Sequence, residues 1–207
     1  GHLFPAIAIA DALMELEPES EILFVGTKNR IEARVVPRKG YQFRSIWISG
    51  LRRSFTAPGN VMFPFKLIVS MMQAVSMVKQ YRPDVVVGTG GYVSGPVLYA
   101  ATLLKVPALI QEQNSYPGVT TRILAQRVNE VHLTFENSKK YFRRQDNLFL
   151  TGNPTRDALE KTDRPEAMKY FGFDPEEQKK TLLIVGGSLG AHTINLAVMR
   201  HFDRLLE

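Results

Sequence analysis

Short apolar runs rich in β-branched residues alternate with helix-length segments along most of this sequence, and this alternation limits the fold more than any other feature. Strands separated by helices join through right-handed crossovers into a parallel sheet. The sequence therefore predicts the α/β class, with a doubly wound parallel sheet in which the run DVVVG at 84–88 is a central strand. The predicted strands cover residues 21–26, 84–88, 107–111, 129–134, 148–150 and 181–185, and the predicted helices cover about 5–15, 64–80, 95–104 and 119–127 and begin again near 192.

We expect one domain and the beginning of a second. Residues 157–180 are polar and charged and contain Pro165 and Pro175, which is typical of a connector between domains. This places an N-terminal domain at 1–156 and the start of a C-terminal domain at 181–207. Because the sequence opens without methionine and stops within a helical pattern, we expect a piece of a longer chain that lacks its first strand.

Composition excludes several classes of protein and site. The 207 residues are 44% hydrophobic, which is enough for a core and excludes a disordered chain. The absence of cysteine excludes disulfides, thiolate metal sites and a cysteine nucleophile. No spacing of His, Asp and Glu is typical of a metal site, so no metal ligand is predicted.

Charge is distributed unevenly. Residues 28–144 contain 18 basic and 5 acidic residues, whereas the whole chain has a net charge of only +6. Such a stretch attracts nucleic acid, an anionic membrane surface or a phosphorylated ligand. A solubilising face would have the same composition, so charge alone does not choose among these interpretations.

An apolar segment, VMFPFKLIVSMMQAVSMVKQY at 61–81, lies inside the basic stretch. It is too short and too interrupted to span a bilayer. As a helix it would present one apolar stripe to a sheet, formed by Leu67, Met71, Ala74, Val75 and Val78. A second stripe contains Val61, Phe65 and Ile68, and it lies beside Lys66, Arg52 and Arg53. An apolar stripe bordered by cations predicts a surface that lies on an anionic membrane. The alternative is that both stripes belong to the core.

Two glycine-rich junctions stand where a strand passes into a helix. In GHLFP, His2 is predicted at a helix N-terminus, where backbone N–H groups favour a diphosphate and an imidazole can act as a base, although a terminal histidine can also be inert. GTGGYVSGP at 88–96 matches neither the dinucleotide fingerprint nor the P-loop. Its glycines would let the backbone approach an anionic or sugar ligand, and Tyr92 and Ser94 offer hydroxyls.

Three further loops carry polar side chains. GGSLGA at 186–191 fits both a hydrolase nucleophile elbow and a phosphate cradle around Ser188. We prefer the cradle, because too few residues follow to supply the acid and histidine of a hydrolase. In QEQNSYPG, Glu112, Gln113 and Asn114 are predicted to bind sugar hydroxyls, with a solvated turn as the alternative, and GNPTR offers Arg156 to a phosphate.

Taken together, these strings resemble the MurG family of UDP-N-acetylglucosamine transferases, which convert lipid I to lipid II in peptidoglycan synthesis. The resemblance implies the two-domain GT-B fold with facing Rossmann-like halves. The N-terminal half would hold the lipid acceptor on the cytoplasmic face of the inner membrane, and the C-terminal half the sugar nucleotide. The strings are GHLFPAIAIA, GTKNRIEARVVPRKGY, ISGLRR, RPDVVVGTGGYVSGP, QEQNSYPGVTTRILA, GNPTR and IVGGSLGAHTIN.

The resemblance also implies residue roles and partners. His2 becomes the candidate base, and the membrane patch coincides with Val61, Phe65, Ile68 and the neighbouring cations. Partners would be the lipid-linked muramyl-peptide acceptor, an anionic membrane and other cell-wall synthesis proteins, with no nucleic acid, no metal and no cofactor beside the substrate UDP-GlcNAc. The family usually has histidine where this chain has Gln111. The implied donor contacts are Gly1, Asn114, Arg156 and Ser188, and the implied acceptor contacts are Gly90, Gly91, Tyr92 and Ser94.

Two rival functions remain open. One is another enzyme of the same fold, such as a sugar-nucleotide epimerase or a glycolipid glycosyltransferase. The other is a membrane- or nucleic-acid-binding module without catalysis. The 207-residue piece alone is expected to be inactive, because most donor-binding motifs of the family would lie beyond it.

Overall fold

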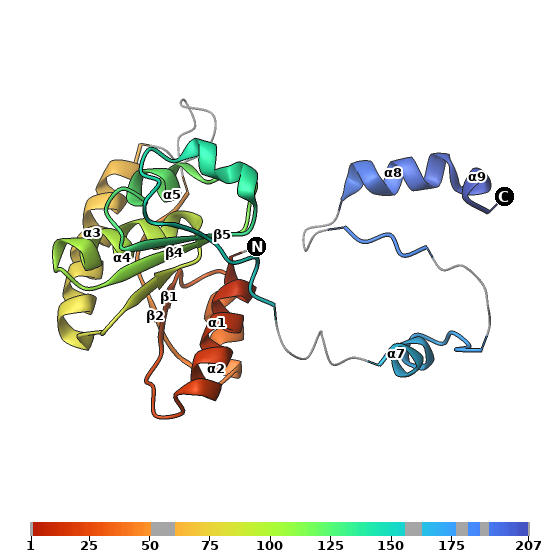
Figure 1. Cartoon of the computed structure of the whole chain (residues 1–207), viewed down its shortest axis with the longest axis horizontal. Coiled ribbons are helices and arrows are strands. Elements are labelled where there is room, and N and C mark those ends of the chain that lie inside the picture. The colour runs from red at the N-terminus through yellow and green to blue at the C-terminus, as the bar shows by residue number, and fades with distance from the viewer. Residues whose placement is uncertain (1, 51–60, 156–162, 177–181, 187–190, 207) are drawn as a thin grey trace. The chain divides into compact units, whose positions relative to one another are not determined.

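The computed structural model describes residues 2–50, 61–155, 163–176, 182–186 and 191–206 (Figure 1). The chain separates into two compact units, Gly1–Lys161 and Thr162–Glu207. The first unit contains every strand of the described residues, and it also contains His2 and the glycine-rich loop at 88–96. In the second unit, α7 (Arg164–Tyr170), α8 (His192–Arg200) and α9 (Phe202–Leu206) are helices.

All strand pairs in the first unit are parallel, which confirms the predicted α/β class. One sheet pairs β1 with β2, and the other has the order β3-β4-β5-β6. Each pair is connected through a helical segment, as parallel strands require. The strands are β1 (Leu23–Gly26), β2 (Gln42–Ser45), β3 (Val86–Gly88), β4 (Ala108–Glu112), β5 (Glu130–Leu133) and β6 (Leu148–Leu150).

Helix α4 is the centre of the packing in this unit. It contacts β3 and β4 and also contacts α3 and α5 (Figure 1). The core between α4, α5 and the four-stranded sheet is aliphatic, with Leu98, Ile110 and Leu133 among its most buried members. The helices are α1 (Leu3–Leu16), α2 (Glu32–Arg38), α3 (Phe63–Tyr81), α4 (Gly91–Leu103) and α5 (Val119–Leu124), followed by the short 3-10 helix η2 (Glu136–Tyr141).

The buried face of α3 differs from the predicted stripe. Ser70, Ala74 and Val78 are buried, at successive i, i+4 spacing, and they pack mainly against α4 rather than a sheet. The Ser70 hydroxyl donates to the Leu67 carbonyl at 2.9 Å, so this polar side chain can be buried at little cost. Leu67 itself is 38% exposed, and its predicted place in the core is wrong.

The prediction of a central strand at 84–88 is also wrong for the described residues. There, β3 pairs with β4 alone, and Val87 is 39% exposed. Residues of β3 and β1 both line a cavity of about 810 Å³. Apolar side chains from α1 and α3, including Ile9 and Met77, line this cavity.

The strand predicted at 181–185 is absent from the described residues 182–186, and the remaining residue lies outside them. Leu183 is 81% exposed and Val185 69% exposed. A strand needs a neighbour for its backbone N–H and C=O groups, and the described part of the second unit holds no other strand. The helix predicted near 192 is confirmed as α8.

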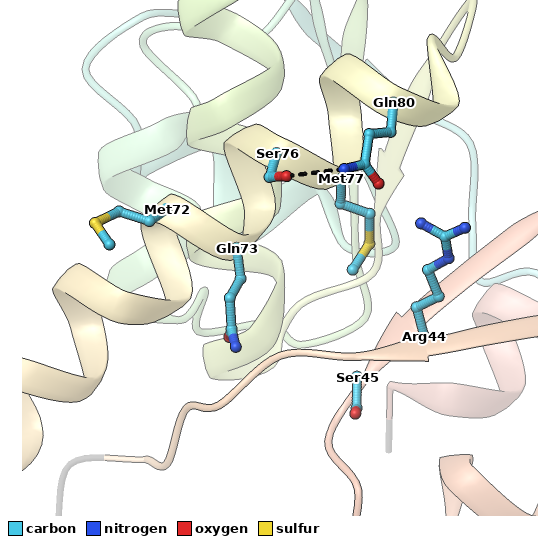
Figure 2. A pocket seen from close by; sticks show the side chains of 7 residues that line it. All are labelled: Arg44, Ser45, Met72, Gln73, Ser76, Met77 and Gln80. Carbon is cyan, nitrogen blue, oxygen red and sulfur yellow. Dashed lines mark hydrogen bonds between the residues drawn. The ribbon is translucent and has the colours of Figure 1, made fainter.

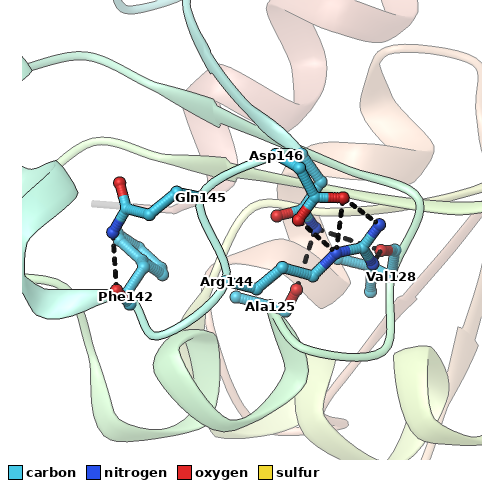
Figure 3. Close-up of polar contacts among 7 residues, drawn as sticks. Ala125, Val128, Phe142, Arg144, Gln145 and Asp146 are labelled. Atoms are coloured by element: carbon cyan, nitrogen blue, oxygen red, sulfur yellow. Dashed lines mark hydrogen bonds and ion pairs between the residues drawn. The ribbon is translucent and has the colours of Figure 1, made fainter.

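A hydrogen-bonded loop fixes the entry to β6 against the end of α5 (Figure 3). Arg144 binds the Asp146 carboxylate through Nε and Nη2, and its Nη1 donates to the Val128 carbonyl at 3.1 Å. The hydrogen bond from Arg144 holds the pKa of Asp146 below its ordinary value. Asn147, which is 2% exposed, donates to the Ala125 carbonyl at 2.9 Å. These contacts set the position at which the chain enters β6.

Tyr41 connects the segment before β2 to α1 through a hydrogen bond, and we expect its loss to destabilise the fold. Its hydroxyl donates to Asp11 Oδ1 at 2.6 Å, and burial together with this carboxylate raises the pKa of Tyr41 to about 12. The unfolded chain loses this proton near pH 10, so the tyrosine's contribution is complete below pH 10 and is lost as pH rises toward 12. Tyr41→Phe should lower the free energy of unfolding by about 1 kcal/mol at pH 7 and weaken this alkaline dependence.

Urea unfolding at pH 7, 9 and 11 measures both effects. Tyr170→Phe is the control, because Tyr170 is 84% exposed in the second unit. Equal effects of the two substitutions would contradict the assigned role of Tyr41.

Candidate functional site

The carboxyl ends of β3, β4, β5 and β6 meet at one edge of their parallel sheet. Thr89 and Gly90 follow β3, Gln113 follows β4, Thr134 follows β5 and Gly152 follows β6. Open α/β sheets bind their ligands at this edge. His2, directly before α1, also reaches it.

His2 is held by contacts to both its backbone and its ring. Its Nδ1 lies 2.9 Å from the Thr89 carbonyl oxygen and 2.9 Å from Gln113 Oε1. The Thr89 hydroxyl donates to the His2 carbonyl at 2.8 Å. His2 as a whole is an exposed residue.

Gly90 and Gly91 lie directly against this ring. Gly90 has φ +102° and Gly91 has φ +78°. Residues other than glycine rarely adopt this region of the backbone, because their Cβ atom is crowded there. A Cβ added at Gly90 would lie 2.7 Å from His2 Nδ1, and one added at Gly91 would lie 3.4 Å from His2 Cδ2. The two glycines therefore allow both the turn into α4 and the close approach of the imidazole.

Tyr92 and Ser94 lie in the first turn of α4, because this helix begins at Gly91 and not near 95 as predicted. The Ser94 hydroxyl donates to the Gly91 carbonyl at 2.8 Å, which leaves its oxygen able to accept but not donate. The Tyr92 ring packs on Gly50, where an added Cβ would lie 3.1 Å from Cδ1. Both residues therefore shape the start of the helix beside His2.

Glu112 shapes the following loop and does not face a ligand. Its side chain is 3% exposed and accepts hydrogen bonds from Asn114 N, Asn114 Nδ2 and Gly118 N at 2.8–3.2 Å. The prediction that Glu112 binds sugar hydroxyls is wrong, because its carboxylate is already satisfied. Asn114 is exposed beside it, with Nδ2 used in this contact.

Four residues at this edge, Thr89, Gln111, Thr134 and Gly152, were not predicted as part of the site. Gln111 is 2% exposed and donates to Thr134 Oγ1 at 3.2 Å and to the Gly152 carbonyl at 3.3 Å. Thr89 holds His2 through its hydroxyl and its carbonyl. A signal existed in the sequence, because each of these residues ends or follows a predicted strand.

The second stripe of α3 is exposed, as the membrane interpretation requires. Val61 is 80%, Phe65 54%, Ile68 60% and Met72 63% exposed. We call these four residues the α3 patch. Phe65, Ile68 and Met72 lie on α3, whose buried side packs on α4, and Val61 lies just before this helix.

Trp47 extends the α3 patch and was not predicted. Its ring meets Phe65 edge-to-face at 5.9 Å between centroids, and Lys66 Nζ lies 5.7 Å from its centroid. Lys66 also donates to Ser49 Oγ at 3.3 Å. A half-exposed tryptophan beside a lysine and apolar side chains is typical of membrane-interface surfaces.

A shallow cavity of about 390 Å³ lies between β2 and α3, next to the α3 patch (Figure 2). Arg44 extends from β2 toward the side of α3 that carries Met77 and Gln80. Met72 belongs both to this cavity and to the α3 patch. The cavity thus adds a cation beside the apolar surface.

Several predicted residues lie outside the described part of the chain: Gly1, Arg52, Arg53, Arg156 and Ser188. Among the described residues, no group of three or more His, Cys, Asp or Glu side chains could hold a metal ion. Within the same ranges, no helix combines the length and the hydropathy that crossing a membrane requires.

Comparisons with known proteins identify the family of the chain. The profile of the glycosyltransferase family 28 N-terminal domain matches residues 1–133. A relative from Flavobacterium psychrophilum, named UDP-N-acetylglucosamine--N-acetylmuramyl-(pentapeptide) pyrophosphoryl-undecaprenol N-acetylglucosamine transferase, is 46% identical over 100% of this chain and 56% of its own length. A relative of the same name from Salinibacter ruber is 45% identical over 100% of this chain and 55% of its own length. The chain spans about half the length of the curated relatives it matches.

Solved structures show the same fold. The crystal structure of MurG from Acinetobacter baumannii has a TM-score of 0.60 and 30% identity, over 78% of this chain and 44% of that one. UDP-GlcNAc 2-epimerase from Neisseria meningitidis has a TM-score of 0.59 over 97% of this chain and 60% of that one, but at 14% identity it supports the fold alone. With a family profile over most of its length and relatives aligned along nearly all of it, the chain belongs to the MurG family within glycosyltransferase family 28.

Proposed function

We propose that this chain forms the acceptor side of an inverting glycosyltransferase. The enzyme would move N-acetylglucosamine from UDP-GlcNAc to the C4 hydroxyl of a muramyl-peptide linked to undecaprenyl diphosphate, converting lipid I to lipid II. Residues 1–156 would bind this acceptor, 157–180 would connect the domains, and 181–207 would begin the part that binds the sugar nucleotide. The names of the relatives supply the substrates.

One observation carries the proposal: an imidazole is held over two glycines at the carboxyl edge of the sheet. The His2 ring has hydrogen-bond partners at Nδ1, and the ring reaches the edge where such folds bind ligands. A positioned imidazole can take the proton of a hydroxyl as it attacks. The geometry therefore suits activation of an acceptor alcohol.

In the proposed step, the acceptor C4 oxygen forms a bond to the anomeric carbon while the bond from that carbon to the UDP oxygen breaks, and UDP leaves with the electron pair. The hydroxyl proton passes to His2. Backbone N–H groups at helix N-termini would stabilise the departing diphosphate, so the proposal requires no metal. A transfer rate that survives addition of EDTA would support this last point, and a rate abolished by EDTA would refute it.

Transfer of labelled GlcNAc to a lipid I analogue tests the function. The enzyme used is a full-length transferase that carries this sequence. An acceptor analogue that lacks the C4 hydroxyl is the matched control. Label should reach the first acceptor and not the second; labelling of both would show that another hydroxyl reacts.

The α3 patch would hold the enzyme on the cytoplasmic face of the membrane, so we expect substitutions in this patch to weaken membrane binding. Phe65→Ser with Ile68→Ser should weaken binding to anionic vesicles by about 10-fold or more, because each buried apolar side chain contributes about 1.5 kcal/mol or more. Trp47, the single tryptophan, contacts Phe65 and reports binding through its own fluorescence. Turnover of a short-chain acceptor analogue should be unchanged.

Leu16→Ser is the matched control, since Leu16 is 79% exposed at the end of α1, away from the α3 patch. It should leave vesicle binding unchanged. If the α3 variant lost thermal stability or short-chain turnover together with vesicle binding, Phe65 and Ile68 would be structural residues instead.

A further inference from the structure

The hydrogen bonds around His2 determine which nitrogen of its ring carries the proton. His2 Nδ1 lies 2.9 Å from the Thr89 carbonyl oxygen, which can only accept. Nδ1 must therefore be the donor, and in the neutral ring Nε2 then holds the lone pair. The second partner at Nδ1 is Gln113, and it agrees with this assignment only if its amide turns the oxygen, and not the nitrogen, toward the ring.

The surroundings of Gln113 fix that orientation. Its Nε2 donates to the Thr89 carbonyl and the Gln111 carbonyl, both at 2.9 Å, and also meets Gln111 Oε1. Exchanging the amide oxygen and nitrogen would place an oxygen against these acceptors and an NH₂ group against the His2 donor. The amide therefore presents its oxygen to His2.

Gln111 in turn is fixed by the backbone. Its Nε2 donates to the Gly152 carbonyl, which is an obligatory acceptor, and to Thr134 Oγ1. Its Oε1 is left for Gln113. Because Gln111 is 2% exposed, solvent does not compete for these contacts. A directed chain of hydrogen bonds thus runs from Gly152 through Gln111 and Gln113 to His2.

We propose that Gln113 is a positioning residue that, together with the Thr89 carbonyl, holds His2 in the Nδ1–H tautomer, so that Nε2 is free to take the acceptor's proton. Gln111 acts one step behind it by fixing the Gln113 amide. The inference rests on the proposed function for its catalytic meaning, but the tautomer itself is a property of this chain. Free histidine favours the opposite tautomer, with the hydrogen on Nε2. The tautomer inferred for His2 therefore differs from the one expected without these contacts.

Long-range ¹H–¹⁵N correlation spectra of a full-length transferase that carries this sequence, recorded at alkaline pH where imidazole is neutral, distinguish the two tautomers. The signals of His2 are assigned as those missing from His2→Gln, which separates them from those of the other histidines. The wild-type chain should show mainly the Nδ1–H pattern. A mainly Nε2–H pattern in the wild type would overturn the proposal without any further variant.

Gln113→Met removes the acceptor while keeping a side chain of similar length, and it should shift His2 toward the Nε2–H tautomer. Gln80→Met is the matched control, because Gln80 is an exposed glutamine on α3 whose Nε2 donates to Ser76 Oγ at 3.3 Å. It should leave the His2 pattern unchanged. An unchanged pattern in folded Gln113→Met, judged by its amide spectrum, would show that Thr89 suffices and would refute the role of Gln113.

Turnover separates this inference from the proposed function. In a full-length transferase, Gln113→Met should lower kcat in proportion to the lost Nδ1–H population, with the KM for UDP-GlcNAc unchanged. A rise in KM with unchanged kcat would assign Gln113 to donor binding and overturn the inference. If the tautomer is as expected but the wild-type enzyme transfers no sugar to the lipid I analogue, the proposed function fails and the tautomer assignment stands.

Discussion

Replacing His2 with alanine in a full-length transferase that carries this sequence is expected to lower kcat by about 100-fold or more. The reason is the loss of the imidazole whose Nδ1 is bound by Thr89 and Gln113 at the sheet edge. The KM for UDP-GlcNAc should change little, since the ring is proposed to act on the acceptor. Steady-state transfer to a lipid I analogue measures both constants.

His132→Ala is the matched control for this substitution. His132 lies on β5, where its Nε2 lies 2.9 Å from Glu130 Oε2 and its ring stacks on Phe149. Its removal should leave kcat within a factor of about two of the wild type, as expected for a position outside the catalytic network. Near-normal turnover of His2→Ala would reassign the base to another group.

The second large effect is expected from Gly90→Ala. The new Cβ would lie 2.7 Å from His2 Nδ1 and 2.9 Å from Cε1, and Gly90 also has φ +102° and ψ −171°. The strained backbone alone costs about 1–3 kcal/mol. The imidazole must also move, so we expect both a lower free energy of unfolding and a loss of turnover comparable to that of His2→Ala.

Gly40→Ala is a control that separates the backbone strain of Gly90→Ala from its contact with the His2 ring. Gly40 has φ +86°, but a Cβ there would meet no atom within 4 Å, so only a strain cost is expected and turnover should remain. Combining Gly90→Ala with His2→Ala removes the clash, and the stability loss from Gly90→Ala should then be smaller by about 0.5–3 kcal/mol. Strictly additive losses in urea unfolding would show that the ring does not lie against Gly90.

Much of the fold could be predicted from local pattern. Short runs that contain apolar residues correspond to β1, β3, β4, β5 and β6, and glycine or proline borders β1, β3 and β4. The strand β2, with the sequence QFRS, carries too few apolar residues to be recognised, and it forms because β1 offers it a parallel partner. The helix α2 is only 7 residues long and contains Pro37, so no helical period could develop.

Pattern alone could not say what an apolar face would meet. The period of α3 correctly identified the exposed stripe, but it placed Leu67 on the buried face and could not show that this face packs mainly on α4. Burial of Ser70 depends on a hydrogen bond within the helix, which no hydropathy pattern contains. The run at 182–185 is as apolar as β3 but has no neighbouring strand among the described residues.

Part of the site could also be predicted from local sequence pattern. Glycine-rich loops after strands pointed to His2, Gly90 and Gly91, which the structure brings into contact. The separate roles of Glu112 and Gln113 could not be predicted, although the two are adjacent. Which one turns into its own loop and which one toward His2 depends on the register of β4 against β5 and on the turn that follows.

Acceptor-dependent release of UDP tests the central claim most directly. A full-length transferase that carries this sequence is incubated with UDP-GlcNAc, with and without a lipid I analogue, and UDP, UDP-sugars and glycosylated acceptor are quantified together. We predict one UDP per molecule of glycosylated acceptor, and no change in UDP-GlcNAc when the acceptor is omitted. Conversion of UDP-GlcNAc into an epimeric UDP-sugar without acceptor would contradict this claim and would identify an epimerase.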